Sequence, residues 1–202
     1  MTDQEYILRF KNFSAQQLQA TEEEWEVMKE YLQLQYFPKN EYFVAEGKVC
    51  RKLGFIAEGV MRYCMFRDDG NDVTCFFIRE NDFVGDPDSF FLQKPSDKNA
   101  QALTDCRLII FTYENMHKFL QQLPRAKEIN AAIDHHVAMK LLHQRTSLLN
   151  LDAGVRYKEF LREYPDILQR IPLSYIASFL GIAQQSLSRL RKQMPSISKK
   201  EN

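Results

Sequence analysis

Apolar residues follow two different spacings along the 202-residue chain, and the changes of spacing divide the chain into three parts. Up to Pro38 they recur every three or four positions, as at Trp25 and Met28, which is typical of helices that bury one face. Thr21 begins the S/T-x-x-E pattern of a helix capping box, and Ser14 is a second candidate for a helix cap. We therefore expect a helical start.

From about residue 41 to residue 111, short runs rich in β-branched and aromatic residues alternate with turn signals. The runs 60–66 and 73–78 flank Asp-Asp-Gly-Asn, a sequence typical of a hairpin turn. Many short strands separated in this way predict an antiparallel sandwich or barrel. The order of the strands cannot be read from the pattern.

After Tyr113 helical spacing returns, and a long helix is predicted over residues 125–151. Its first apolar stripe consists of Ile129, Ile133, Val137, Leu141 and Leu148. Its second stripe consists of Ala131, Ala138, Leu142 and Leu149. A helix with two apolar faces needs two surfaces to pack against. We expect the β domain to cover one face and the same helix of a second subunit the other, with the first stripe as the dimer interface. The alternative is a central helix within one globular subunit.

Residues 171–192 indicate two short helices around a tight turn. Pro172 suits a helix start, and Gly181 stands where the first helix must end, a position that favours a residue tolerant of positive φ. In the second helix Leu187 and Leu190 face inward. The pattern predicts a helix-turn-helix whose second helix enters the major groove of DNA. The alternative is an ordinary pair of helices with a solvated polar face.

The outward positions of these two helices carry side chains that can bind DNA. Glutamine can hydrogen-bond adenine, arginine can hydrogen-bond guanine, and hydroxyl or basic groups can contact phosphates. No outward residue of the second helix is acidic. The candidate DNA-binding residues are Ser174, Gln184, Gln185, Ser186, Ser188, Arg189, Arg191 and Lys192. Among them, Gln184, Gln185 and Arg189 are the expected base readers.

Charge supports this prediction only locally. The whole chain has 27 Lys and Arg residues and 27 Asp and Glu residues, so its net charge of +0 excludes no class of partner. Residues 170–202 contain six basic residues and one acidic residue, which gives +5 there and −5 for residues 1–169. A basic end on an otherwise acidic protein is the electrostatic feature expected of a DNA-binding protein.

Other classes of function are disfavoured. Cys50, Cys64, Cys75 and Cys106 have no C-x-x-C spacing, so we expect reduced core thiols and not a metal or iron–sulfur site. No histidine precedes His117, which opposes a metal-dependent jelly-roll enzyme. No apolar run could span a bilayer, and the first residues do not resemble a signal peptide. We therefore expect a cytoplasmic protein without a metal, a cofactor or a membrane partner.

The order of helical start, β sandwich, long helix and helix-turn-helix resembles that of the Crp/Fnr family of bacterial transcription regulators. The most specific local resemblance lies in residues 176–182 and 186–191, whose version is similar to the branch common in Bacteroidetes. The resemblance implies an α+β fold. It comprises a jelly-roll effector-sensing domain over 1–124, a dimerisation helix over 125–151 and a helix-turn-helix domain over 152–202.

The effector pocket departs from the family pattern. In members that bind cyclic nucleotides, a Gly-Glu pair holds the ribose and an Arg-Ser pair holds the cyclic phosphate. The matching residues here are Gly85 with Asp86, and Lys98 with Asn99. Aspartate is one methylene shorter than glutamate, and lysine lacks the two-pronged fork that arginine offers a phosphate. We expect a pocket that is retained in outline and does not bind cyclic AMP strongly, so the effector is unknown.

The DNA-reading part departs from the family as well. Ala183 stands where the family usually has a Ser or Thr that caps the recognition helix, and Gln184 and Gln185 replace an Arg-Glu pair that reads bases. Only residues 193–202 follow that helix, which is too short for a full two-stranded wing. Little or no wing is therefore expected.

Together these features predict a dimeric, sequence-specific transcription regulator that is not an enzyme. Its expected partners are double-stranded DNA with a palindromic site, a second copy of the chain, an unknown small-molecule effector and RNA polymerase. The alternative is a small-molecule-sensing module whose helix-turn-helix serves as a protein-interaction surface. The missing wing and Ala183 favour this alternative, and the acid-free helix face opposes it.

Overall fold

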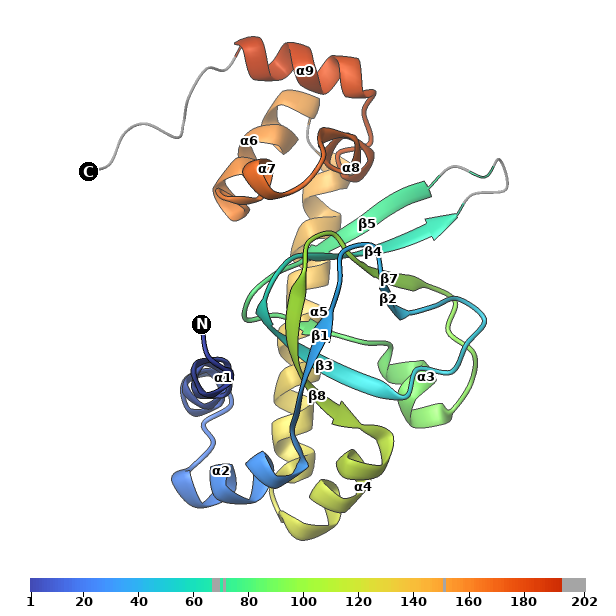
Figure 1. Ribbon diagram of the computed structural model, residues 1–202. Helices are drawn as coiled ribbons and strands as arrows, with labels where there is room; N and C mark the ends of the chain where they lie inside the picture. Colours follow the sequence, from blue (N-terminus) through green and yellow to red (C-terminus); the bar gives the residue numbers. More distant parts are fainter. Residues whose placement is uncertain (67–69, 71, 151, 194–202) are drawn as a thin grey trace, which may run out of the picture.

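The protein consists of a β domain, a long helix that runs alongside it, and a small helical unit at one end (Figure 1). The computed structural model describes residues 1–193 except 67–69, 71 and 151. It leaves undescribed the side chains of Asn130, His136, Lys140, Leu141 and 143–150. Residues 194–202, where little or no wing is expected, therefore lie outside the described residues.

The chain begins with helices α1 (Asp3–Gln17) and α2 (Glu22–Met28) and the short 3-10 helix η1 (Lys29–Tyr31). The capping box at Thr21 is confirmed, because its hydroxyl accepts from the Glu24 N–H and the Glu24 carboxylate accepts from the Thr21 N–H. The prediction for Ser14 is wrong. Ser14 lies inside α1, where its hydroxyl donates to the Lys11 carbonyl at 2.8 Å, and Thr2 caps that helix instead.

In the part of the chain that the structure describes, eight strands form two four-stranded antiparallel sheets. They are β1 (Gln33–Phe37), β2 (Tyr42–Val44), β3 (Lys52–Glu58), β4 (Met61–Phe66), β5 (Asp72–Ile78), β6 (Phe83–Val84), β7 (Asn99–Ala102) and β8 (Cys106–Thr112). Sheet A has the order β1-β8-β3-β6, and sheet B has the order β2-β7-β4-β5. This strand order is that of a jelly roll, which confirms the predicted β architecture.

The two faces of sheet A bury different residues, because successive side chains of a strand point to opposite sides. On the inner face, Gly54 pairs with Ile110, and a Cβ on Gly54 would lie 3.1 Å from the Leu108 side chain. On the outer face, Phe55 pairs with Ile109, and its ring centroid lies 4.8 Å from that of Phe10 on α1. Sheet A therefore packs on sheet B with one face and on the helices with the other.

The remaining helices surround this domain and continue beyond it. They are α3 (Pro87–Leu92), α4 (Tyr113–Gln122), α5 (Ala126–Asn150), α6 (Ala153–Glu163), α7 (Ile167–Arg170), α8 (Leu173–Phe179) and α9 (Gln184–Gln193). Helix α5 runs along the β domain from α4 to the C-terminal unit, which we define as α6 to α9 (Figure 1).

The apolar stripes of α5 are used differently from the prediction. Ile129 is buried against the β-domain core, and Ile133 is half-buried against it, so the stripe predicted for a dimer is covered within one chain. The other stripe is open, with Ala131 and Ala138 exposed and Leu142 60% exposed. The sequence shows two apolar stripes on α5 but not which of them faces the β domain. Packing decides this, and it turns the stripe with Ile129 and Ile133 toward the domain. Leu141 and Leu148 lie outside the described side chains.

An aromatic cluster joins the C-terminal unit to sheet B. Phe77 of β5 is 2% exposed, and its ring centroid lies 6.0 Å from Phe160, 6.2 Å from Tyr164 and 5.3 Å from Phe179. Aromatic pairs at such distances stabilise an interface beyond their buried area. The β domain therefore contributes a core residue to the helical unit.

Phe77→Ala should lower the free energy of unfolding by about 3–5 kcal/mol, because it leaves a cavity among three aromatic rings. Urea denaturation followed by circular dichroism measures this change. Phe66→Ala is the matched control, since Phe66 is 52% exposed and its loss should cost no more than about 0.5 kcal/mol. Equal effects of the two substitutions would contradict the packing described.

Candidate nucleic-acid interface and effector site

The turn between α8 and α9 has the geometry expected from its glycine. Gly181 has φ +65°, and its N–H donates to the Ser178 carbonyl at 3.1 Å. The N–H of Ile182 donates to the Ala177 carbonyl at 3.0 Å. These two bonds form the Schellman motif, which satisfies the last carbonyls of α8 and needs a residue that tolerates positive φ. The prediction for Gly181 is confirmed.

Helix α9 presents a polar surface away from the β domain (Figure 1). Leu187 is buried and Leu190 is half-buried, so the inward positions are as predicted. The predicted contact residues are exposed or half-buried. They are Gln184, Gln185, Arg189, Arg191 and Lys192, which are exposed, and Ser186 and Ser188, which are half-buried. Ser174 is exposed on α8.

Arg191 has a second role inside the unit. Burial raises the pKa of the Tyr157 hydroxyl, and Arg191, which hydrogen-bonds that hydroxyl, partly opposes the shift. Tyr157 lies on α6 and is 3% exposed. The Arg191 side chain is therefore partly committed to holding α9 on α6, whereas Arg189 has no such contact among the interactions described.

The four predicted effector residues come together at the segment from Gly85 to Asn99. Asp86 is buried and caps α3 by accepting from the Ser89 N–H at 3.3 Å. Its carboxylate also accepts from the Ser96 hydroxyl at 2.7 Å and lies 3.5 Å from the Lys98 ammonium. The segment is thus tied together by its own side chains.

Gly85 and Asn99 are tied to the fold in the same way. The Tyr63 hydroxyl donates to the Gly85 carbonyl at 2.6 Å and accepts from the Gly85 N–H at 2.9 Å. Gly85 has φ +153°, and a Cβ there would lie 2.5 Å from Leu53. The Asn99 amide accepts from the Glu46 N–H at 2.9 Å. These groups hold backbone and do not point free donors at a ligand.

The charge balance of the segment opposes a phosphate ligand. The Lys98 ammonium lies 3.5 Å from Asp86 and 3.7 Å from the exposed Asp97. Two carboxylates around one ammonium give the segment a net negative charge. A phosphate would have to displace Asp86 from Lys98 and would leave that buried carboxylate without its cation, which is costly.

Sequence reasoning missed Arg62, which is 1% exposed on β4. Its guanidinium donates to Gln101 at 2.7 and 3.1 Å, to Thr74 at 3.0 Å and to Asp72 at 2.7 Å. Its Cζ atom lies 4.0 Å from the centroid of the Tyr175 ring on α8, a cation–π contact. The sequence does contain one signal, because Arg62 stands within an apolar run that predicts a strand. An arginine that is buried in such a strand needs partners for its charge.

Further polar contacts join sheet B to the C-terminal unit. The Thr74 N–H donates to the Ser178 hydroxyl of α8 at 3.0 Å. Arg170 binds the Glu80 carboxylate with two bonds of 2.6 and 2.9 Å. Burial raises the pKa of Glu80, whereas the hydrogen bonds from Arg170 and from the Gly59 N–H lower it. Together the lowering effects are larger, so the pKa of Glu80 lies below its usual value. Helix α8 is therefore attached to sheet B.

The cysteines offer no reactive centre. Cys50, Cys64 and Cys106 are buried, Cys75 is half-buried, and none of the four forms a disulfide. Burial raises the pKa of Cys64 and of Cys106 to about 11, which keeps both as thiols. Among the described residues no three His, Cys, Asp or Glu side chains are grouped as metal ligands would be. Within the same residues, no helix is long and apolar enough to cross a bilayer.

Part of the chain matches a known domain family, and its fold resembles those of solved structures. Residues 34–123, which include β2 to β8, match the family model of the cyclic nucleotide-binding domain. No curated protein matches the sequence. Solved structures that match include several that are 15–20% identical, and the likeness to these is one of fold.

Three of these structures cover most of both chains. The c-di-GMP-responsive global regulator CLP of Xanthomonas campestris is 18% identical, with a TM-score of 0.68 over 86% of this chain and 91% of its own. FixK2 of Bradyrhizobium japonicum is 15% identical, with a TM-score of 0.70 over 80% and 83%. A protein of Eubacterium rectale assigned to the Crp/Fnr family of transcriptional regulators is 16% identical, with a TM-score of 0.67 over 90% and 87%.

Asp86→Asn should make stability less dependent on pH. Burial raises the pKa of Asp86, but the hydrogen bonds from Ser96 and Ser89 and the charge of Lys98 lower it more, so the folded protein favours the carboxylate. The stabilisation is therefore complete above the ordinary pKa of about 4 and is lost as pH falls through the lower folded value.

Urea unfolding at neutral pH and between about pH 5 and pH 3 tests this expectation. The variant should be less stable than the parent at neutral pH, and the difference should shrink on acidification. Asp88→Asn is the control, because the Asp88 side chain is 78% exposed and should leave the pH dependence unchanged. A constant difference at all pH values would contradict the role given to Asp86.

Proposed function

We propose that the protein is a sequence-specific DNA-binding transcription regulator of the Crp/Fnr type that acts as a homodimer. Residues 1–124 form the sensor, 125–151 the dimerisation helix and 152–202 the DNA reader. The observation that carries the proposal is the exposed, acid-free face of α9, with Gln184, Gln185 and Arg189 directed away from the β domain. The matched structures support it, since they include a global regulator and a Crp/Fnr-type regulator.

The dimer would form along the open stripe of α5. Ala131, Ala138 and Leu142 follow one another on an exposed face, and Met139 beside them is 53% exposed. Exposed apolar residues in such a line are typical of a coiled-coil seam. Two-fold pairing along it would present two α9 helices to half-sites about 34–36 Å apart, one turn of DNA. RNA polymerase is the further partner that such a regulator would contact.

This regulator is expected not to bind cyclic AMP strongly, and its effector is unknown. Asp86 already pairs with Lys98, and the segment has more carboxylates than cations. Calorimetric titration with cyclic AMP should therefore give no binding in the micromolar range. Micromolar or tighter affinity would show that the Asp86–Lys98 pair opens for a phosphate, and would overturn this part of the proposal.

Selection of bound sequences from random duplex DNA tests the DNA function, with purified protein and no added ligand. Enrichment of a palindrome with half-sites one helical turn apart is the expected result. A complete lack of enrichment, together with capture of a specific protein partner through α9, would instead favour a sensing module whose helix-turn-helix is a protein-interaction surface.

On the selected site, Arg189→Ala should weaken specific binding by about 1–3 kcal/mol, because it removes a base or phosphate contact. Fluorescence anisotropy titration measures the affinity. Arg51→Ala is a matched control, since it removes the same charge from an exposed position. The Arg51 carbonyl accepts from the Tyr113 N–H at the start of α4, and α4 lies at the opposite end of the molecule from α9 (Figure 1). An Arg189→Ala variant that binds as tightly as Arg51→Ala would remove Arg189 from the interface.

A further inference from the structure

The C-terminal unit covers an edge of sheet B. Strand β5 is the last strand in the order β2-β7-β4-β5, so the described sheet has no further strand to bond the outward N–H groups of β5. The N–H of Thr74 on this strand donates instead to the Ser178 hydroxyl of α8 at 3.0 Å. A helix that covers a sheet edge protects it from pairing with another chain. Helix α8 therefore completes the β domain at this edge.

The contacts with the C-terminal unit follow β5 along its length. Near Thr74, the guanidinium of the buried Arg62 packs on the ring of Tyr175 from α8. Toward the other end of the strand, the ring of Phe77 packs on that of Phe179, with centroids 5.3 Å apart. A strand rises roughly 3.3 Å per residue, so these two contacts are about 10 Å apart.

Charged groups hold the unit beyond the end of the strand. The Arg79 guanidinium donates to the Glu163 carbonyl at 2.7 Å and lies 3.3 Å from the Asp166 carboxylate. The Glu80 carboxylate accepts two bonds from Arg170 of α7, at 2.6 and 2.9 Å. The side chains of Glu80 and Arg170 are 22% and 26% exposed, so salt screens this pair less than a pair at the surface.

Contacts at both ends of β5 fix the orientation of the C-terminal unit. A single contact would let the unit turn about that point, whereas separated contacts prevent such a turn. Orientation matters for a dimer because two joined binding units engage two half-sites in one event. The stiffness of the connection then decides which separations of the half-sites can be bound.

We propose that the β5 edge and the turn after it set the separation of half-sites that the protein accepts. In this role Thr74, Glu80 and Ser178 are positioning residues, which act through the orientation of α9 and do not touch DNA. The inference rests on the proposed function. A unit released from β5 keeps its own contacts with one half-site but loses the preorganisation for two half-sites at one fixed separation.

Glu80→Gln tests the proposal, because glutamine keeps an acceptor for the Gly59 N–H, now 2.8 Å from Glu80, and loses the charge that binds Arg170. Fluorescence anisotropy gives the affinity for a duplex with one half-site, for the selected full site, and for full sites with one to three base pairs inserted at the centre. Each inserted base pair moves a half-site by about 3.4 Å and turns it by about 35°.

Two inserted base pairs should weaken binding of the parent about tenfold or more. In Glu80→Gln the uninterrupted site should bind about threefold more weakly and the same insertion should cost about threefold or less, because the freed units adapt to other separations. The affinity for one half-site should be unchanged. Glu41→Gln is the matched control, since it removes the same charge from an exposed side chain that has no partner among the described interactions.

Equal insertion profiles of Glu80→Gln and Glu41→Gln would overturn the proposal. So would a weaker half-site affinity of Glu80→Gln with an unchanged cost of insertion, since Glu80 would then support only the fold of the C-terminal unit. Both outcomes are distinct from a failure of the proposed function, in which the parent selects no DNA site.

Amide hydrogen exchange without DNA tests the docking itself. The Thr74 N–H is bonded to Ser178 only while α8 is docked, so its exchange should be about tenfold faster in Glu80→Gln than in the parent. The Cys50 N–H is the matched reference, because it donates to the Ser89 hydroxyl at 2.9 Å within the β domain and should exchange equally in both. Equal Thr74 rates in parent and variant would overturn the proposal whether or not the protein binds DNA.

Discussion

The burial of one positive charge constrains how the two ends of this protein fit together. Arg62 is 1% exposed, and a buried guanidinium is tolerated only if its hydrogen bonds are made and its charge is compensated. Asp72, Thr74 and Gln101 accept those hydrogen bonds within sheet B. The remaining open side is closed by the ring of Tyr175. Since Tyr175 belongs to α8, satisfying Arg62 also places α8 on sheet B.

The position of α9 follows from this constraint. Phe77 pairs with Arg62 in the sheet and fills the aromatic centre of the C-terminal unit, so the two contacts share one face of sheet B. With α8 and α6 committed to that face, the exposed side of α9 is directed away from the β domain (Figure 1). Tyr175 and Phe179 therefore connect sheet B directly to the C-terminal unit.

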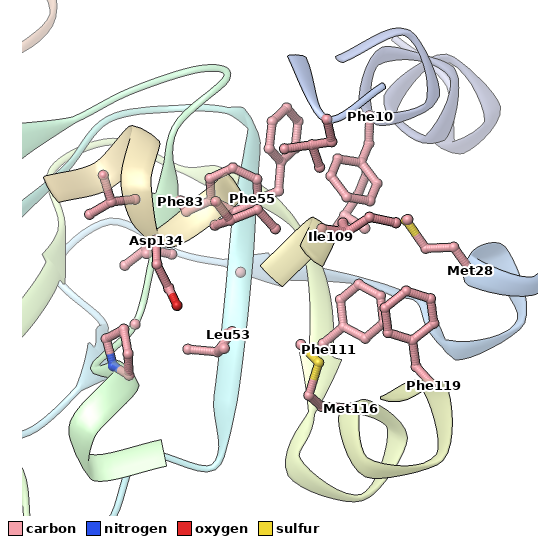
Figure 2. A pocket seen from close by; sticks show the side chains of 18 of the residues that line it. Phe10, Met28, Leu53, Phe55, Phe83, Ile109, Phe111, Met116, Phe119 and Asp134 are labelled. Carbon is pink, nitrogen blue, oxygen red and sulfur yellow. The ribbon is translucent and has the colours of Figure 1, made fainter. Parts of the chain in front are cut away.

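The two regions where a ligand could act differ in how their polar groups are satisfied. At the segment from Gly85 to Asn99, carboxylate, hydroxyl and ammonium groups bind one another and hold backbone in place. A new anion would break contacts that already exist. Between sheet A and α5 lies a cavity whose described lining is mostly apolar (Figure 2), and its charged side chains are Asp88 and Asp134.

Local sequence patterns determined much of this structure. Spacing alone predicted the helical start, the many short strands, the long helix and the helix-turn-helix, because these periods reflect which side of an element meets the core. The helix cap at Thr21 and the positive φ at Gly181 were also predicted correctly, because both depend only on residues within one helical turn. Ser14 was misread because a hydroxyl can also bond backward inside a helix.

Only the tertiary structure decided what depends on residues far apart in the chain. The jelly-roll strand order pairs β1 with β8 across more than half the β domain, and no local period encodes that pairing. The stripe of α5 that contains Ile133 faces the β domain because the sheet lies there, although both stripes are apolar. Likewise, the local sequences around Arg62 and Tyr175 contain nothing that predicts their contact. The sequence by itself determined the elements and the polar face of α9, and packing determined which surfaces remain free to bind.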